Sequence, residues 1–234
     1  MKKSKILSLI AAGALTLAMG AFALTGCAKG VDYTFEAEEA ELCEGLKVQN
    51  GKQWTANDDG ADVTVVSYFA NAGQTITWTI NAASDCNVKL KLRASSCAFG
   101  ALNASNEVVD LGEIMGSIMQ GGAIEEGTKG YVSELKAADC GSVLKVNDAE
   151  VTMSGTLPST TIELADGNPW ALMGVYSVIN CGEFTADAKL KKGENKIVLE
   201  VVTSGFNVDS LTVNSSAELT FTETDNSDRV QQQG

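Results

Sequence analysis

Two glutamates near the start of the chain, Glu36 and Glu38, are the first residues whose spacing suggests chemistry. They are two positions apart, so on a β-strand their side chains would point to the same side. Two carboxylates aimed at one place repel each other unless a cation lies between them. The alternative is a pair of ordinary solvated acids in a very acidic protein, and the spacing alone favours that alternative.

The chain has no histidine. This absence excludes Ser-His-Asp and Cys-His catalysis as well as zinc held by histidine. A pair of acids can still hydrolyse glycosidic bonds without histidine. The lack of histidine therefore narrows the possible chemistry without forbidding every kind of enzyme.

The N-terminal residues have the features of a bacterial lipoprotein signal. A basic start is followed by an uncharged apolar run over 6–24, which is about long enough to span a bilayer. A retained anchor helix is the alternative, but Gly13 and Gly20 weaken that helix, and the run ends in Leu-Thr-Gly-Cys at 24–27, which resembles a lipobox. We therefore expect a signal peptide over 1–26 and a lipid on Cys27, which places the protein on the outer side of a cell membrane.

The expected mature chain has 208 residues, enough for one sizeable domain or two small ones. It carries 14 Lys+Arg against 30 Asp+Glu, a net charge of −16. Such a surface repels nucleic acid and anionic lipid headgroups, and suits neutral ligands or divalent cations. A tether of five residues, 28–32, would reach about 20 Å and keep the domain close to the membrane.

Five cysteines remain once Cys27 is acylated, so at least one thiol is unpaired. They have no Cys-x-x-Cys spacing, which argues against a metal cluster. Their pairing cannot be deduced from the sequence. They are Cys43, Cys86, Cys97, Cys140 and Cys181.

Short runs in which apolar and polar residues alternate dominate the chain, and turns of Gly, Asn and Asp separate them. The clearest are 75–80, 88–93, 197–201 and 211–213. Alternation with period two indicates strands with one buried face, so we predict a single all-β domain over 33–220, a jelly-roll β-sandwich. An insertion over about 103–141 contains apolar residues at helical spacing within 107–119, and we expect a short amphipathic helix packed on the sandwich. The polar tail 222–234 is expected to be disordered.

Three segments, in this order, resemble carbohydrate-binding modules of families 6 and 35, which have a galactose-binding-like β-sandwich. They are YTFEAEEAEL at 33–42, VSYFANAGQTITW at 66–78, and LKKGENKIVL at 190–199 with FNVDSL at 206–211. The resemblance covers most of 33–214. The chain departs from the family pattern at Ser67, where glycine is usual, at Gln74, where aspartate is common, and in the long insertion, which bears on the ligand more than on the fold.

The resemblance implies a structural Ca²⁺ bound by Glu36, Glu38 and a third carboxylate, Asp209 from the closing strand. Calcium takes six to eight oxygen ligands, several of them backbone carbonyls, and here it would clamp the first strand to the last. All family-matched carboxylates are then used for calcium. We therefore expect no enzymatic activity.

The resemblance also implies a sugar site. Sugars present an apolar C–H face and a rim of hydroxyls, which suits an aromatic ring with amides at its edge. Tyr68, Trp170 and Asn207 match the family's ligand-binding positions, and Trp54 is a loop aromatic that could join them. Tyr68 and Trp170 could instead be core residues, whereas the apolar neighbours of Trp78 assign it to the core.

We therefore expect a monomeric, membrane-anchored, non-catalytic lipoprotein that binds an oligosaccharide or envelope glycan weakly and is stabilised by calcium. The alternative is a structural or adhesive cell-envelope lipoprotein whose sandwich binds another protein. The two differ in whether Tyr68, Trp170 and Asn207 converge on one open cleft.

Overall fold

The computed structural model describes residues 30–51, 63–67, 69, 71–96, 99–123, 125–163, 181–201 and 206–231. Four residues with predicted roles lie outside these ranges: Cys27, Trp54, Tyr68 and Trp170. Their roles therefore stay predictions. Within the described ranges, no helix has the length and apolar composition needed to cross a membrane.

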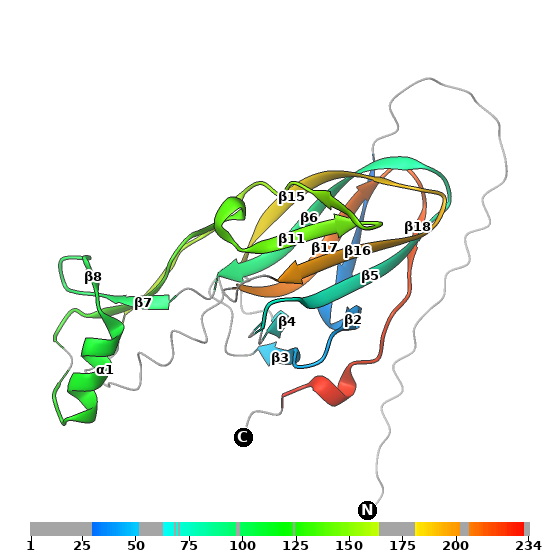
Figure 1. The fold of residues 1–234 in the computed structure, drawn as a ribbon. Coiled ribbons are helices and arrows are strands. Elements are labelled where there is room, and N and C mark those ends of the chain that lie inside the picture. Colours follow the sequence, from blue (N-terminus) through cyan, green and yellow to red (C-terminus); the bar gives the residue numbers. More distant parts are fainter. Residues whose placement is uncertain are drawn as a thin grey trace, which may run out of the picture.

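Two six-stranded antiparallel sheets pack face to face and form a β-sandwich (Figure 1). Sheet A has the order β15-β6-β17-β4-β3, with β1 also paired to β17. Its strands are β1 (Val31–Glu36), β3 (Lys47–Gly51), β4 (Val63–Ser67), β6 (Cys86–Ser96), β15 (Cys181–Leu190) and β17 (Phe206–Ser215). The predicted all-β sandwich is confirmed.

Sheet B has the order β12-β11-β16-β5-β18, with β2 also paired to β5. Its strands are β2 (Glu41–Leu42), β5 (Gln74–Ala82), β11 (Ser142–Val146), β12 (Ala149–Val151), β16 (Gly193–Val201) and β18 (Leu219–Phe221). From β15 to β18 each strand lies in the opposite sheet to the one before it. Such crossing between two sheets is the arrangement of a jelly roll.

The core lies between the two sheets and follows the alternation seen in the sequence. On β5, Ile76, Trp78 and Ile80 are fully buried. On β6 of the other sheet, Leu90 and Leu92 are buried, whereas the intervening lysines face outward. The predicted core position of Trp78 is confirmed.

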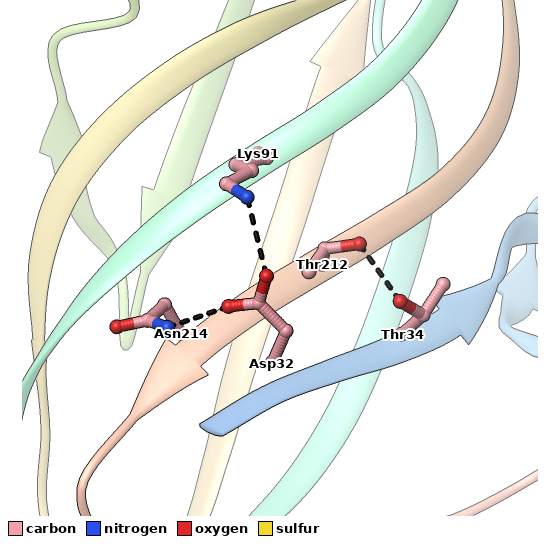
Figure 2. A network of polar contacts seen from close by, with 5 residues as sticks. All are labelled: Asp32, Thr34, Lys91, Thr212 and Asn214. Carbon is pink, nitrogen blue, oxygen red and sulfur yellow. Dashed lines mark hydrogen bonds and ion pairs between the residues drawn. The ribbon is translucent and has the colours of Figure 1, made fainter. Parts of the chain in front are cut away.

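Side-chain contacts on the outer face of sheet A join β1 to its neighbours (Figure 2). Asp32 accepts hydrogen bonds from Asn214 Nδ2 at 2.5 Å and from Lys91 Nζ at 3.2 Å. The Thr34 and Thr212 hydroxyls are 2.9 Å apart. Because β1 already begins at Val31, two residues expected in the tether belong to the sheet. The segment linking Cys27 to the fold is correspondingly shorter.

The insertion is larger than expected and mostly β. A third sheet has the order β14-β9-β7-β8, and one α-helix lies between β8 and β9. These elements, which we call the arm, are β7 (Phe99–Leu102), β8 (Val108–Val109), α1 (Leu111–Met119), β9 (Lys129–Val132) and β14 (Thr160–Glu163). The expected helix is present, but it begins four residues later, where the Asp110 carboxylate caps it by accepting from Glu113 N–H. It lies in the arm, beyond the end of the sandwich (Figure 1), and is not packed on it as expected.

Between the arm and the sandwich, β10 (Leu135–Lys136) pairs with β13 (Thr156–Leu157), and the 3₁₀ turn η2 (Ala137–Asp139) follows β10. The insertion then adds β11 and β12 to the edge of sheet B, where β11 pairs with β16. The inserted residues therefore extend the sandwich as well as the arm.

The C-terminal tail, expected to be disordered from residue 222, is packed against the N-terminal segment as far as residue 231. Asn226 Nδ2 donates to the carbonyls of Glu38 at 2.8 Å and Ala40 at 2.7 Å. Arg229 Nη1 donates to the Cys43 carbonyl at 2.5 Å. The tail contains the 3₁₀ turn η5 (Ser227–Arg229), and its polar side chains supply hydrogen bonds that a polar composition does not reveal.

Candidate functional site

Asn207 lies on the outer face of sheet A, near the end of the sandwich from which the arm leaves. It pairs with Ser95 on β6. On the other side Val208 pairs with Val66, so the antiparallel register places Ser67 next to Asn207. Ser95, Asn207 and Ser67 therefore form a cross-strand row, and all three are buried, with 1%, 9% and 4% exposure.

Both serines that flank Asn207 carry an unusual feature. The hydroxyls of Ser67 and Ser95 are buried and have no hydrogen-bond partner among the described residues. Within the described part of the chain, no hydrogen bond is formed by the Asn207 side-chain amide either. Buried polar groups without partners are costly, and such groups in a folded protein point to a ligand, an ion or a water. This row therefore offers two hydroxyls and an amide to a polar partner.

For the aromatic residues expected at this site, only the position in the sequence is known. Tyr68 directly follows Ser67 but lies outside the described residues, as do Trp170 and Trp54. The structure thus positions the amide of the predicted site and adds two serines beside it. Whether the three ligand-binding side chains converge on one cleft stays a prediction.

The three predicted calcium ligands lie close together, next to the Asn207 row. Glu36, at the end of β1, pairs with Ser210 on β17. Asp209 is the extra residue in a β-bulge between Val208 and Ser210, and it is 7% exposed. Glu38 does not share a strand with Glu36 as expected, because β1 ends at Glu36 and Glu38 lies in the 3₁₀ turn η1 (Ala37–Glu39).

Glu36, Glu38 and Asp209 repel one another electrostatically, although Glu38 lies in the turn and not on the strand. Burial, foremost, and the charges of Glu36, Asp209 and Glu39 raise the pKa of Glu38 to about 7, against a hydrogen bond from its own backbone that lowers it. Burial also raises the pKa of Glu36, and the Asp209 and Glu39 charges raise it further. Within the part of the chain that the structure describes, the Oε2 atom of Glu38 is buried without a hydrogen-bond partner. The cluster is therefore short of positive charge.

One cation of the chain already lies in this cluster. Arg93 Nη1 donates to Asp209 Oδ2 at 2.5 Å, and the Ser210 hydroxyl donates to the same oxygen at 3.0 Å. The positive charge of Arg93 also lowers the pKa of Glu36. The sequence did not point to Arg93, because its partner is 116 positions away and only the register of β6 and β17 brings them together.

The acid cluster fits a cation in part. In its favour are an orphaned buried carboxylate oxygen and three mutually repelling acids, and calcium prefers such oxygen ligands. Against it, no group of three or more acidic, Cys or His side chains among the described residues is arranged to hold a metal ion as it stands. Asp209, held by Arg93 and Ser210, would have to use its other oxygen.

No protein-family model matches the chain, and no curated protein matches it. Solved structures similar to it include a β-(1,4)-mannanase with a family 35 carbohydrate-binding module from Podospora anserina, at 16% identity over 81% of this chain with a TM-score of 0.44; this chain spans only 28% of that one. A family 35 module from Clostridium thermocellum is 18% identical, with 78% of this chain and 97% of that chain covered and a TM-score of 0.41.

A third similar structure is the C-terminal family 6 module of a marine laminarinase from Zobellia galactanivorans. It is 11% identical, with 79% of this chain and 99% of that chain covered and a TM-score of 0.40. The modules in these three structures belong to families 35 and 6, the two families that the sequence resembles.

Proposed function

We propose that this protein binds carbohydrate without catalysis, at the end of sheet A marked by Asn207. The observation that carries the proposal is the row in which two buried, unpartnered serine hydroxyls flank an asparagine amide. A sugar hydroxyl both donates and accepts hydrogen bonds, so one sugar ring could satisfy all three groups. The resemblance of 206–211 to a family segment with a ligand-bonding asparagine supports the same residue.

The apolar half of the site would come from Tyr68 and Trp170. Tyr68 directly follows Ser67 in the chain, and its role rests on the resemblance of 66–78 to the family. A ring that stacks on the C–H face of a sugar supplies apolar contact area, while the row binds the sugar's hydroxyls. With so few contacts, affinity should be weak, in the range of about micromolar to millimolar.

We further propose that the domain is held at a membrane by a lipid on Cys27. Three residues, 28–30, separate that cysteine from β1, so the tether spans at most about 14 Å. A domain held this close to a membrane meets soluble oligosaccharides that diffuse inward, or a glycan already present in the envelope.

A bound Ca²⁺ at Glu36, Glu38 and Asp209 completes the proposal. The ion would supply the positive charge that the cluster lacks and would join the start of the domain to its closing strand. The unpartnered Glu38 Oε2 supports it. In this role the ion stabilises the fold and takes no part in a reaction.

The function is tested by screening the full-length protein on a glycan array and titrating the best hit by calorimetry. Asn207→Ala should weaken binding at least about tenfold, since it removes a buried amide from the contact. Tyr68→Ala and Trp170→Ala should weaken it as strongly by removing stacking area. The matched control is Asn214→Ala, which changes an asparagine on the same strand and face, far from the row.

Two results would contradict the proposal. If Asn207→Ala, Tyr68→Ala and Trp170→Ala all fold and bind as the wild type does, the sugar is bound elsewhere. If no glycan binds, the alternative of a structural or adhesive protein that binds another protein takes its place.

A further inference from the structure

The far end of the arm, which we call the tip, comprises residues 103–123 and 125–128. The chain has no Lys or Arg between Arg93 and Lys129. In the same stretch it has five acids: Glu107, Asp110, Glu113, Glu125 and Glu126. All charged residues of the tip are therefore acids, whereas the sandwich carries both acids and lysines.

The tip also exposes apolar side chains. In the described part of the chain only three large apolar residues are exposed, and two of them are in the tip: Val108 at 69% and Met119 at 83%. On α1, Ile114, Met115 and Ile118 are only half-buried, although they follow the spacing of a helix face that is normally covered. A helix face of this kind, left open to water, is typical of a protein contact surface.

A cavity of about 270 Å³ lies beside this helix. Val109 and Ile114 form apolar walls, and the carboxylate residues Asp110, Glu113 and Glu125 line the same space. A lysine or arginine side chain has this pattern, with an apolar stem and a charged end. No basic residue of the tip itself can fill the cavity, because the tip has none.

We propose that the tip is a docking surface for a basic amphipathic segment of a partner protein. One Lys or Arg side chain enters the cavity, its stem along Val109 and Ile114 and its charge toward the carboxylates. Apolar side chains of the segment cover Met119 and Val108. Charge selects this occupant, because anionic lipids and a second copy of this acidic chain are both repelled by the tip.

The proposal is independent of the sugar site, and a designed peptide tests it. A fluorescent 14-residue amphipathic helix of leucine and lysine is titrated into the full-length protein and followed by anisotropy, beside the same peptide with glutamate for lysine. The tip variant Glu113→Gln/Glu125→Gln is compared with Glu194→Gln/Glu218→Gln, which removes the same charge from exposed positions of the sandwich. Met119→Ser tests the apolar contact at unchanged charge, and circular dichroism confirms that each variant is folded.

The expected result is binding of the lysine peptide alone, weakened about fivefold or more by the tip pair and by Met119→Ser, and unchanged by the sandwich pair. Equal losses for both charge pairs would mean general attraction to an acidic protein and would overturn the proposal. No binding of the lysine peptide would overturn it too. So would sedimentation showing a wild-type dimer that Met119→Ser dissociates, since a second copy would then be the occupant.

Discussion

Arg93 and Asp209 form an ion pair of 2.5 Å across two neighbouring strands of sheet A, with side-chain exposures of 29% and 10%. Asp209 also acts on Glu36 and Glu38 through its charge. The Arg93 guanidinium therefore acts on two acids of this cluster, on Asp209 through the ion pair and on Glu36 through its charge. Arg93 thus supplies part of the positive charge that calcium would supply according to the resemblance. A metal ion and Arg93 would share the cluster, and each should compensate in part for loss of the other.

Arg93→Met should therefore destabilise the protein when Ca²⁺ is absent. The substitution leaves the buried Asp209 carboxylate beside like charges, and a loss of about 1–3 kcal/mol in the free energy of unfolding is expected for a pair that is not fully buried. Urea unfolding in the presence of a chelator measures it. Lys91→Met is the matched control, because it removes an exposed pair with Asp32 and should have a much smaller effect.

Adding Ca²⁺ should raise the midpoint of thermal unfolding of the wild type, because an ion bound only by the folded state stabilises that state. Glu38→Gln separates charge from metal binding. It should stabilise the chelated protein, since it removes a buried acid that repels its neighbours, and should abolish the response to Ca²⁺. Glu150→Gln, an exposed acid, should keep the response. A wild type whose midpoint is the same with and without chelator has no calcium site.

Asn226→Ala should destabilise the fold through the N-terminal segment. Its amide satisfies the carbonyls of Glu38 and Ala40, and the residue is 7% exposed. Leaving buried carbonyls without a donor should reduce the free energy of unfolding by about 1–3 kcal/mol. Asp225→Ala, next to it and exposed, is the control. Equal urea midpoints for Asn226→Ala and the wild type would show that the tail contributes nothing.

The strands of the sandwich could be predicted because burial of one face imposes a period of two, as in Ile76, Trp78 and Ile80. The short strands between β6 and β15 could not, since β8, β10 and β13 have two residues each and too few positions to show a period. The tail was missed for a different reason. Its contacts are hydrogen bonds from Asn226 and Arg229 to backbone carbonyls, and any polar segment offers such donors.

The candidate site was predictable only where it depends on local order in the chain. Asn207 and Asp209 could be proposed from the segment that contains them. Ser95, Ser67 and Arg93 could not, because they reach the site through the pairing of β6, β17 and β4, and serine has no distinctive sequence pattern. Glu38 left the strand because β1 ends at Glu36, yet its carboxylate remained within the electrostatic reach of the same cluster.

Cys140 should be the least reactive of the described thiols. Burial raises its pKa, and its Sγ–H donates to the Ala137 carbonyl at 3.1 Å. Fewer thiolate anions then form at pH 8, and the thiolate is the reactive species. Timed labelling with iodoacetamide, followed by peptide mass spectrometry, should modify the half-buried Cys86 well before Cys140. Equal labelling rates for Cys86 and Cys140 in the native protein would contradict this explanation.

Ser95→Ala should separate binding from stability. Ser95 is 1% exposed, and its hydroxyl has no hydrogen-bond partner in the described ranges. Removing the hydroxyl should therefore leave the free energy of unfolding unchanged or raise it by about 1 kcal/mol. If that hydroxyl forms a hydrogen bond with a sugar, the same change should weaken sugar binding about three- to tenfold, the value of one hydrogen bond.

Ser210→Ala is the control with the opposite pattern, because the Ser210 hydroxyl already donates to Asp209 at 3.0 Å. This variant should be less stable and should bind sugar with unchanged affinity. Urea unfolding and calorimetry on the three proteins decide the matter. A Ser95→Ala protein that is less stable and binds sugar normally would show that the hydroxyl serves the fold, and the row around Asn207 would lose its role as the sugar site.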